Sequence, residues 1–177
     1  MSKSLAAEFE ALANRLKTGD AANDQLSIPA LADRIAKNLS VKPDEVAILA
    51  VSERQRHLYF LVPHALRNVG QIPLSSTSAL AARTVRESRP DIVNNFSSTR
   101  HASVFEGVKA DTLTASVIQR IISAPILADG KVIGVIQISR KAQTLAEAGP
   151  EFTADDLGKL LAICKPLGKL IQHVAKH

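Results

Sequence analysis

The chain has 177 residues, of which 46% are hydrophobic and 22% are charged, and its formal net charge is +5. This composition is typical of one soluble globular domain and argues against a disordered chain or a fibrous repeat. Because the basic residues are scattered singly and aromatic residues make up only 3%, a nucleic-acid interface is not indicated.

The N-terminal segment predicts an amphipathic helix from about Ser4 to Lys17. Its apolar residues are three or four positions apart and form one stripe. These residues are Leu5, Phe9, Leu12 and Leu16. The charged Glu8, Glu10 and Arg15 rule out the core of a signal peptide, and no apolar run in the chain reaches about 18 residues. We therefore expect a soluble, cytoplasmic protein.

A linker and a second helix are expected next. Residues 18–25 are small and polar, and Ser27 followed by Pro29 has the pattern of a helix start. The buried face of this helix is expected to carry Ile28, Leu31, Ile35 and Leu39. We divide the chain into an N-terminal helix and linker, residues 1–26, and a main domain, residues 27–177.

Short apolar runs predict the first strands. Residues 45–52 and 57–63 are separated by a short charged loop, so they are expected to pair as antiparallel neighbours. Two brief strands are expected at residues 71–74 and 91–95. Between them, residues 79–88 predict a helix that one residue of 75–78 could cap and that Pro90 ends.

Residues 95–116 are polar and have no clear periodicity, a pattern typical of a functional or mobile segment in a compact domain.

The sequence from Ile121 to Ser139 predicts a hairpin that turns at Asp129-Gly130. A two-residue turn pairs Ala128 with Lys131 and places alternate residues on opposite faces. One face would carry Ile121, Ser123, Pro125, Leu127, Val132, Gly134, Ile136 and Ile138, and the other Ile122, Ala124, Ile126, Ala128, Ile133, Val135, Gln137 and Ser139. Both faces are mainly apolar, so both need a cover. We expect the terminal helices over one face and the more polar residues 75–116 over the other, above a cavity.

The last helix is expected from about Thr153 to Ala175. Thr153 and Asp156 have the spacing of a capping box, and Pro166 predicts either a bend or an end near Lys165 followed by a restart. The apolar stripe comprises Leu157, Leu160, Leu161, Cys164, Leu167, Ile171 and Val174. Cys164 is the only cysteine, which excludes an intramolecular disulfide and favours a reducing compartment, and its place on the stripe favours a buried, inert thiol.

Three stretches, in this order and spacing, resemble the GAF domain family across roughly residues 27–174. They are IPLSSTSALAARTVRESRPDIVNN, ISAPILADGKVIGVIQIS and FTADDLGKLLAI. The resemblance implies an α/β (α+β) fold with a central antiparallel sheet of five or six strands and helices on both faces, and we expect the N- and C-terminal helices to pack together. It also implies a small-molecule pocket beneath the irregular segment.

Three branches of that family can be compared position by position. The cyclic-nucleotide branch carries Asn-Lys, Phe and Asp-Glu where this chain has Arg140-Lys141, Phe152 and Asp156-Leu157, so the Asn and the Glu are missing. Bilin-binding members attach their chromophore through a cysteine in the irregular segment, where this chain has SSTRHASVF. The free methionine-sulfoxide reductases use several cysteines, and this chain has one.

Candidate ligand-binding residues fall into three groups. Ser76 and Thr77 lie before a helix, where hydroxyls and N–H groups stabilise anions, although plain capping explains them as well. Gln137 is polar within an apolar strand, and backbone partners are an alternative to a ligand. The third group combines amides, a guanidinium, an imidazole and aromatic rings, and also fits a solvated loop anchored by two phenylalanines. Its members are Asn94, Asn95, Phe96, Arg100, His101 and Phe105.

The sequence contains no nucleophile motif, no phosphate-binding loop and no pair of histidines with the spacing of metal ligands, so we expect no catalytic residues and no metal. The expected function is a non-enzymatic sensor in signal transduction that binds a small molecule of unspecified identity. It would form a homodimer through its terminal helices and act on a partner protein, without binding membranes. The alternatives are a small enzyme similar to the methionine-sulfoxide reductases and a dimerisation scaffold without a ligand.

Overall fold

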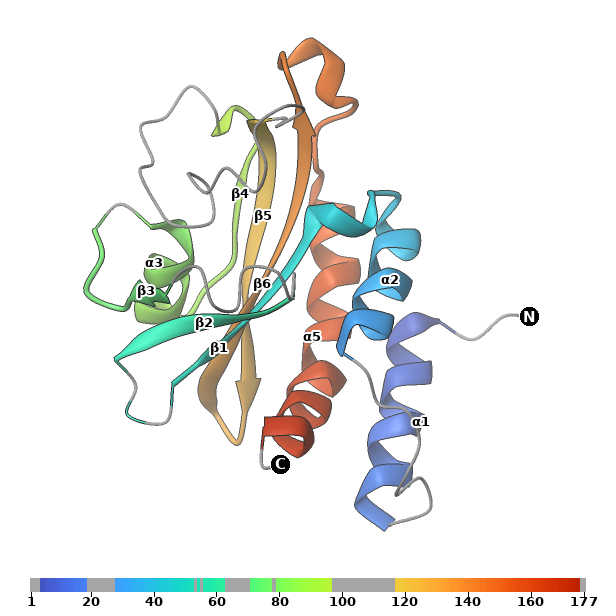
Figure 1. Ribbon diagram of the computed structural model, residues 1–177. Helices are drawn as coiled ribbons and strands as arrows, with labels where there is room; N and C mark the ends of the chain where they lie inside the picture. The colour runs from blue at the N-terminus through green and yellow to red at the C-terminus, as the bar shows by residue number, and fades with distance from the viewer. Residues whose placement is uncertain are drawn as a thin grey trace.

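The computed structural model describes residues 4–18, 28–52, 54, 56–62, 71–77, 79–96 and 117–175 (Figure 1). Its helices are α1 (Leu5–Thr18), α2 (Ile28–Leu39), α3 (Leu80–Glu87) and α5 (Ala154–Ala175). Its strands are β1 (Val46–Val51), β2 (His57–Val62), β3 (Gln71–Pro73), β4 (Asp91–Val93), β5 (Val117–Ala128) and β6 (Lys131–Ala142). Within these residues, no helix is both long and apolar enough to span a bilayer.

The strands form one sheet in the order β3-β2-β1-β6-β5-β4, and every neighbouring pair is antiparallel. This confirms the expected sheet of five or six strands. The two brief strands, β3 and β4, lie at its two edges. The long hairpin of β5 and β6 lies between β1 and β4, so the centre of the sheet comes from segments with the most continuous apolar sequence.

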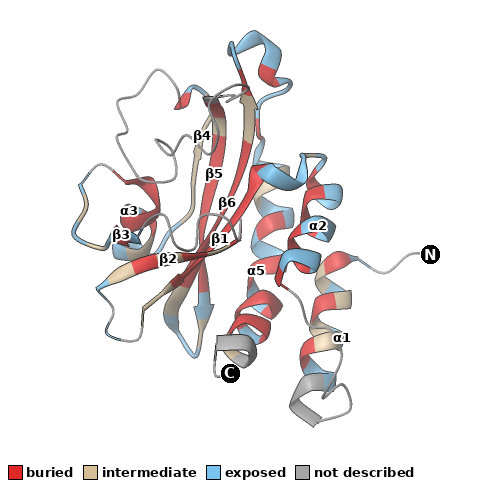
Figure 2. Ribbon diagram, in the orientation of Figure 1, coloured by how far each residue is buried: buried red, intermediate tan, exposed pale blue. Residues whose placement is uncertain are grey.

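Helices cover both faces of the sheet, as predicted. Helices α1, α2 and α5 lie on one side and α3 on the other (Figure 1), and buried residues run along the central strands between them (Figure 2). The two sides form separate hydrophobic clusters, with Ile122, Ile136 and Ile138 facing the three helices, and Ile121 and Val135 facing α3. The region under α3 is therefore a second core.

The two terminal helices pack against each other, which confirms that prediction. Phe9 of α1 is fully buried and Leu5 nearly so. On the outer side, Lys169 Nζ of α5 donates to Glu10 Oε1 of α1 over 2.7 Å. In α2, all four residues expected on the buried face are buried.

Helix α5 begins with the predicted capping box. The Thr153 N–H donates to Asp156 Oδ2 over 2.9 Å, and the Asp156 N–H donates to Thr153 Oγ1 over 3.2 Å. The helix then runs through Pro166 without ending. The expectation that Leu161 belongs to the buried stripe is wrong, because this side chain is 39% exposed. The stripe is rotated toward Ile163 and Leu170, which are both buried.

The hairpin turns at Asp129-Gly130 and pairs Ala128 with Lys131, as predicted, but the predicted faces are wrong. Leu127 pairs with Val132 and Ile126 pairs with Gly134, so Ile133 is one extra residue in β6. Such a bulge moves every following side chain to the opposite face, because side chains alternate with a period of two. Ser123 and Gln137, predicted on opposite faces, therefore form a cross-strand pair on the α3 side.

Candidate functional site

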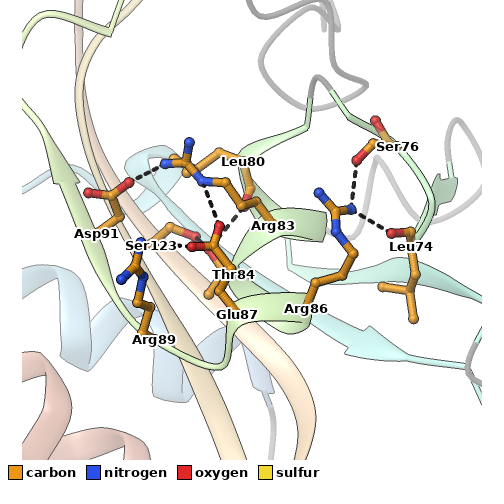
Figure 3. A network of polar contacts seen from close by, with 10 residues as sticks. All are labelled: Leu74, Ser76, Leu80, Arg83, Thr84, Arg86, Glu87, Arg89, Asp91 and Ser123. Atoms are coloured by element: carbon orange, nitrogen blue, oxygen red, sulfur yellow. Dashed lines mark hydrogen bonds and ion pairs between the residues drawn. The ribbon is translucent and has the colours of Figure 1, made fainter.

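A chain of buried hydrogen bonds connects the middle of the sheet to α3. Gln137 Nε2 donates to Ser123 Oγ over 3.2 Å, and Ser123 Oγ lies 2.7 Å from Thr84 Oγ1. Thr84 Oγ1 donates to the Leu80 carbonyl over 2.9 Å, which uses its only hydrogen. Ser123 must then be the donor to Thr84, so every bond in this polar chain runs from Gln137 toward α3 (Figure 3 shows its α3 end). All three side chains are at most 2% exposed.

The amide oxygen of Gln137 ends the polar chain on the other side. Gln137 is fully buried between Ala47 of β1 and Ser123 of β5, and within the described residues its Oε1 atom has no hydrogen-bond partner. A buried acceptor without a donor costs about 1–3 kcal/mol. This atom is therefore a place where a donor from a bound molecule would be stabilising.

The turn that carries Ser76 and Thr77 is fastened to the side of α3. Arg86 Nη1 donates to the carbonyls of Leu74 and Ser76 over 2.6 and 2.7 Å (Figure 3). Ser76 Oγ accepts the N–H of Ala79, the residue before the helix, over 3.1 Å. Thr77 is exposed. The turn is thus held in a fixed position beside the start of α3.

Salt bridges join the outer side of α3 to β4. Arg83 of α3 contacts both Glu87 and Asp91, the first residue of β4, and Arg89 Nη2 lies 2.8 Å from Glu87 Oε1 (Figure 3). These side chains are exposed, so each pair contributes little to stability. Together with Thr84, they fix the position of α3 over the sheet.

Asn94 holds the backbone in front of α5. Its Nδ2 donates to the Phe152 carbonyl over 3.0 Å, and its Oδ1 accepts the Phe152 N–H over 2.8 Å. Both the nitrogen and the oxygen of the Asn94 side chain are therefore hydrogen-bonded to the backbone of Phe152. Asn95 next to it is exposed, whereas Phe96 is 4% exposed and belongs to the core under α3.

Two arginines lie at the same place, one of them against the Phe152 ring. The Arg140 guanidinium lies 4.8 Å from the centre of the Phe152 ring, within the range of a cation–π contact. Arg120 Nη1 donates to the Asn94 carbonyl over 2.6 Å, and its Nε donates to the Gly149 carbonyl over 3.2 Å. We call Asn94, Arg120, Arg140 and Phe152 the Phe152 clasp. Two positions of the cyclic-nucleotide motif, Arg140 and Phe152, thus serve packing in this chain.

The structure brings some predicted site residues to the same side of the sheet and leaves others undescribed. Gln137 and Phe96 lie in the core under α3, and Ser76 is fastened to that helix. Arg100, His101 and Phe105 lie outside the described residues. Thr84 and Ser123 are part of the polar chain and were missed from the sequence, because only the bulge at Ile133 places Ser123 opposite Gln137.

Comparison with known proteins agrees with this architecture. The family model of the GAF domain matches residues 28–171. The chain belongs to the GAF domain family. No curated protein matches its sequence.

Several solved structures have a similar fold. The GAF domain from the Acinetobacter phosphoenolpyruvate-protein phosphotransferase is 14% identical with a TM-score of 0.67, and the match covers 97% of this chain and 93% of that one. Residues 122 to 287 of a methyl-accepting chemotaxis protein are 11% identical with a TM-score of 0.63, covering 97% and 96%. The free methionine-R-sulfoxide reductase from Neisseria meningitidis, in complex with its substrate, is 18% identical with a TM-score of 0.56, covering 99% and 95%. At these identities the likeness shows the fold alone.

Cys164, the single cysteine of the chain, is the residue that would have to supply a thiol for reductase-like catalysis. It is 5% exposed in the core between α5 and the sheet, and burial raises the pKa of its thiol to about 12. The thiolate is the reactive form of cysteine, so at neutral pH this thiol is both inaccessible and protonated.

Proposed function

We propose that this GAF domain is a non-enzymatic, cytoplasmic sensor that binds a small molecule on the α3 side of its sheet. The observation that supports this most strongly is the amide oxygen of Gln137 at the end of the buried polar chain, which has no hydrogen-bond partner among the described residues. An apolar face with a few directed polar atoms is the usual composition of a small-molecule site. The ligand would present an N–H or O–H donor to Gln137, and residues 94–116 with Ser76 and Thr77 would complete the site.

The ligand-binding part of the proposal is tested by replacing Gln137 with leucine. The change removes the free acceptor and the donor to Ser123, so we expect the affinity for a co-purifying small molecule to fall at least roughly tenfold. Native mass spectrometry of freshly purified protein, compared with the denatured protein, measures the bound mass and the number of subunits together.

A matched control for that variant is Gln119→Leu. Gln119 is also a buried glutamine, on β5, and its Nε2 donates to the Ala142 carbonyl over 2.9 Å. This bond joins β5 to the end of β6 and is not part of the polar chain, so this variant should lose stability and keep the ligand. A wild-type protein without any bound mass, or a ligand that survives Gln137→Leu, would contradict the proposed site.

We also propose that the domain forms a homodimer through α1 and α5 and transmits its signal to a partner protein. Leu161 supports this, because it is one of the large apolar side chains that remain exposed, at 39%, on the outside of α5. Subunit number in the same mass spectra tests the dimer, and a monomer would argue against it.

A reductase-like enzyme is the second candidate, since the Neisseria meningitidis structure has that activity in its name. If catalysis depended on a thiol here, Cys164 would have to supply it. We expect Cys164→Ala to leave ligand binding unchanged, and the native thiol to react with a disulfide reagent such as DTNB at least about a hundredfold more slowly than in urea, because it is buried and protonated. A fast-reacting thiol, or a methionine-sulfoxide reductase activity lost in Cys164→Ala, would favour the enzyme instead.

A further inference from the structure

A groove opens at the end of the sheet where β1 and β6 separate. These strands pair from Val46↔Ile138 to Ala50↔Gly134, and there the pairing ends, although both strands continue. The pairing ends next to the bulge residue Ile133, and a bulge bends its strand and interrupts the ladder locally. Residues beyond the last pair face each other across a gap.

This groove has a volume of about 330 Å³, at the lower end of the range for small-molecule sites. Its apolar wall comes mainly from Val51, Val132 and Ile133. Polar side chains on its lining are Ser52, Asp129, Lys131 and Gln172. None of these residues belongs to the site proposed for the α3 side.

The groove is held in shape before any ligand binds. Gly168 of α5 lies directly against the Leu127 carbonyl, which fixes the helix to the hairpin one turn before Gln172. The turn residues Asp129 and Gly130 have positive φ angles of 53° and 77°, a tight hairpin turn. Such preorganisation lowers the cost of binding.

The charges around the groove are opposite and unpaired. In the described part of the chain, neither the Asp129 carboxylate nor the Lys131 ammonium has an ion-pair partner within 4.0 Å, not even each other. Asp129 has only a long bond of 3.4 Å from Gln172 Nε2. Ser52 Oγ accepts the N–H groups of Arg56 and His57, so its own hydrogen stays available as a donor.

We infer that this groove binds a free α-amino acid with an apolar side chain. The ammonium group of the ligand would pair with Asp129, and its carboxylate with Lys131 and the Ser52 hydroxyl. The side chain would lie on Val51, Val132 and Ile133. A zwitterion fits where a simple anion or cation does not, because each single charge would meet one like charge at the groove.

The test is a titration of the full-length, isotope-labelled protein with L-leucine, followed by the amide NMR signals. We expect the signals of residues 129–133 and of Gln172 to shift, with a dissociation constant on the order of 1 mM for so small and open a site. N-acetyl-L-leucine amide, which has the same side chain and neither charge, should leave these signals unchanged.

Two variants and two controls complete the experiment. Asp129→Asn keeps a residue that tolerates the positive φ angle, and Lys131→Gln removes the positive charge but keeps a flexible polar side chain; each should weaken L-leucine binding at least roughly tenfold. Lys159→Gln, an exposed lysine elsewhere on α5, should bind normally, and Gln137→Leu should too if it folds, which separates this groove from the α3-side site. The inference is overturned if L-leucine shifts no signals at the groove up to about 20 mM, or if the neutral amide binds equally well.

Discussion

Gly168→Ala is expected to destabilise the protein by about 3 kcal/mol, because the new methyl group has no room. A Cβ at this position would lie 2.2 Å from the Leu127 carbonyl oxygen and 3.2 Å from its carbon, and both atoms belong to the backbone of β5. The helix would have to move away from the sheet, and the apolar residues around it would lose contact. Urea unfolding followed by circular dichroism measures the change.

The same helix supplies the control. A Cβ at Gly158 would meet nothing within 4 Å, so Gly158→Ala should raise stability by about 0.5–1 kcal/mol, through the better helix propensity of alanine. The two substitutions are chemically identical and are expected to have opposite signs. Equal effects at the two sites would show that α5 does not approach β5 as closely as described.

Phe152→Ala is the second large effect, with an expected loss of about 3–5 kcal/mol. The ring is 3% exposed, and its removal leaves a cavity beneath Arg140 and loosens the backbone that Asn94 holds. Because the clasp also fixes the start of α5, this helix should lose protection from hydrogen exchange first. Chemical denaturation gives the magnitude, and hydrogen exchange gives the location.

Two further variants serve as comparisons, one at the same position and one on the exposed side of α5. Phe152→Leu keeps most of the volume and should cost clearly less than Phe152→Ala. Leu161→Ala truncates an exposed side chain of α5 and should cost less than about 1 kcal/mol in the monomer. If Leu161→Ala destabilised the protein as much as Phe152→Ala, α5 would bury a different face from the one described.

Local sequence patterns were sufficient to predict most of the elements of this fold. The four apolar residues of α2 recur with the helical period and are all buried, and Asp129-Gly130 marks the hairpin turn. The alternation of polar and apolar residues reveals the pairing register of two strands only where one face of the strand is polar. Residues 121–138 are mainly apolar on both faces, so shifting β6 by one residue mostly replaces one apolar residue by another, and the pattern gives little sign of the change.

Less of the candidate site than of the fold could be predicted from the sequence, for a related reason. Gln137 could be selected because it is a polar residue between two isoleucines. The other two members of the polar chain could not be predicted. Thr84 and Ser123 are 39 positions apart and meet only because α3 packs over the hairpin. The same holds for Asn94, whose amide is engaged by the backbone of a residue 58 positions later. Such pairings depend on tertiary packing, which no local period encodes.

The extra residue at Ile133 decides which interior each later side chain of β6 enters. If the intact hairpin paired without the bulge, the two cores would be exchanged: Ile136 and Ile138 would turn toward α3, and Gln137 and Ser139 toward the three helices. A buried amide and a hydroxyl would then lie in a layer of leucine and isoleucine. Deleting Ile133 would have no such effect, because Ile126 would still pair with Gly134 and Ser123 with Gln137. The polar residues of β6 therefore disfavour the unbulged pairing of the full strand, whereas a strand shorter by that one residue would keep the same two interiors.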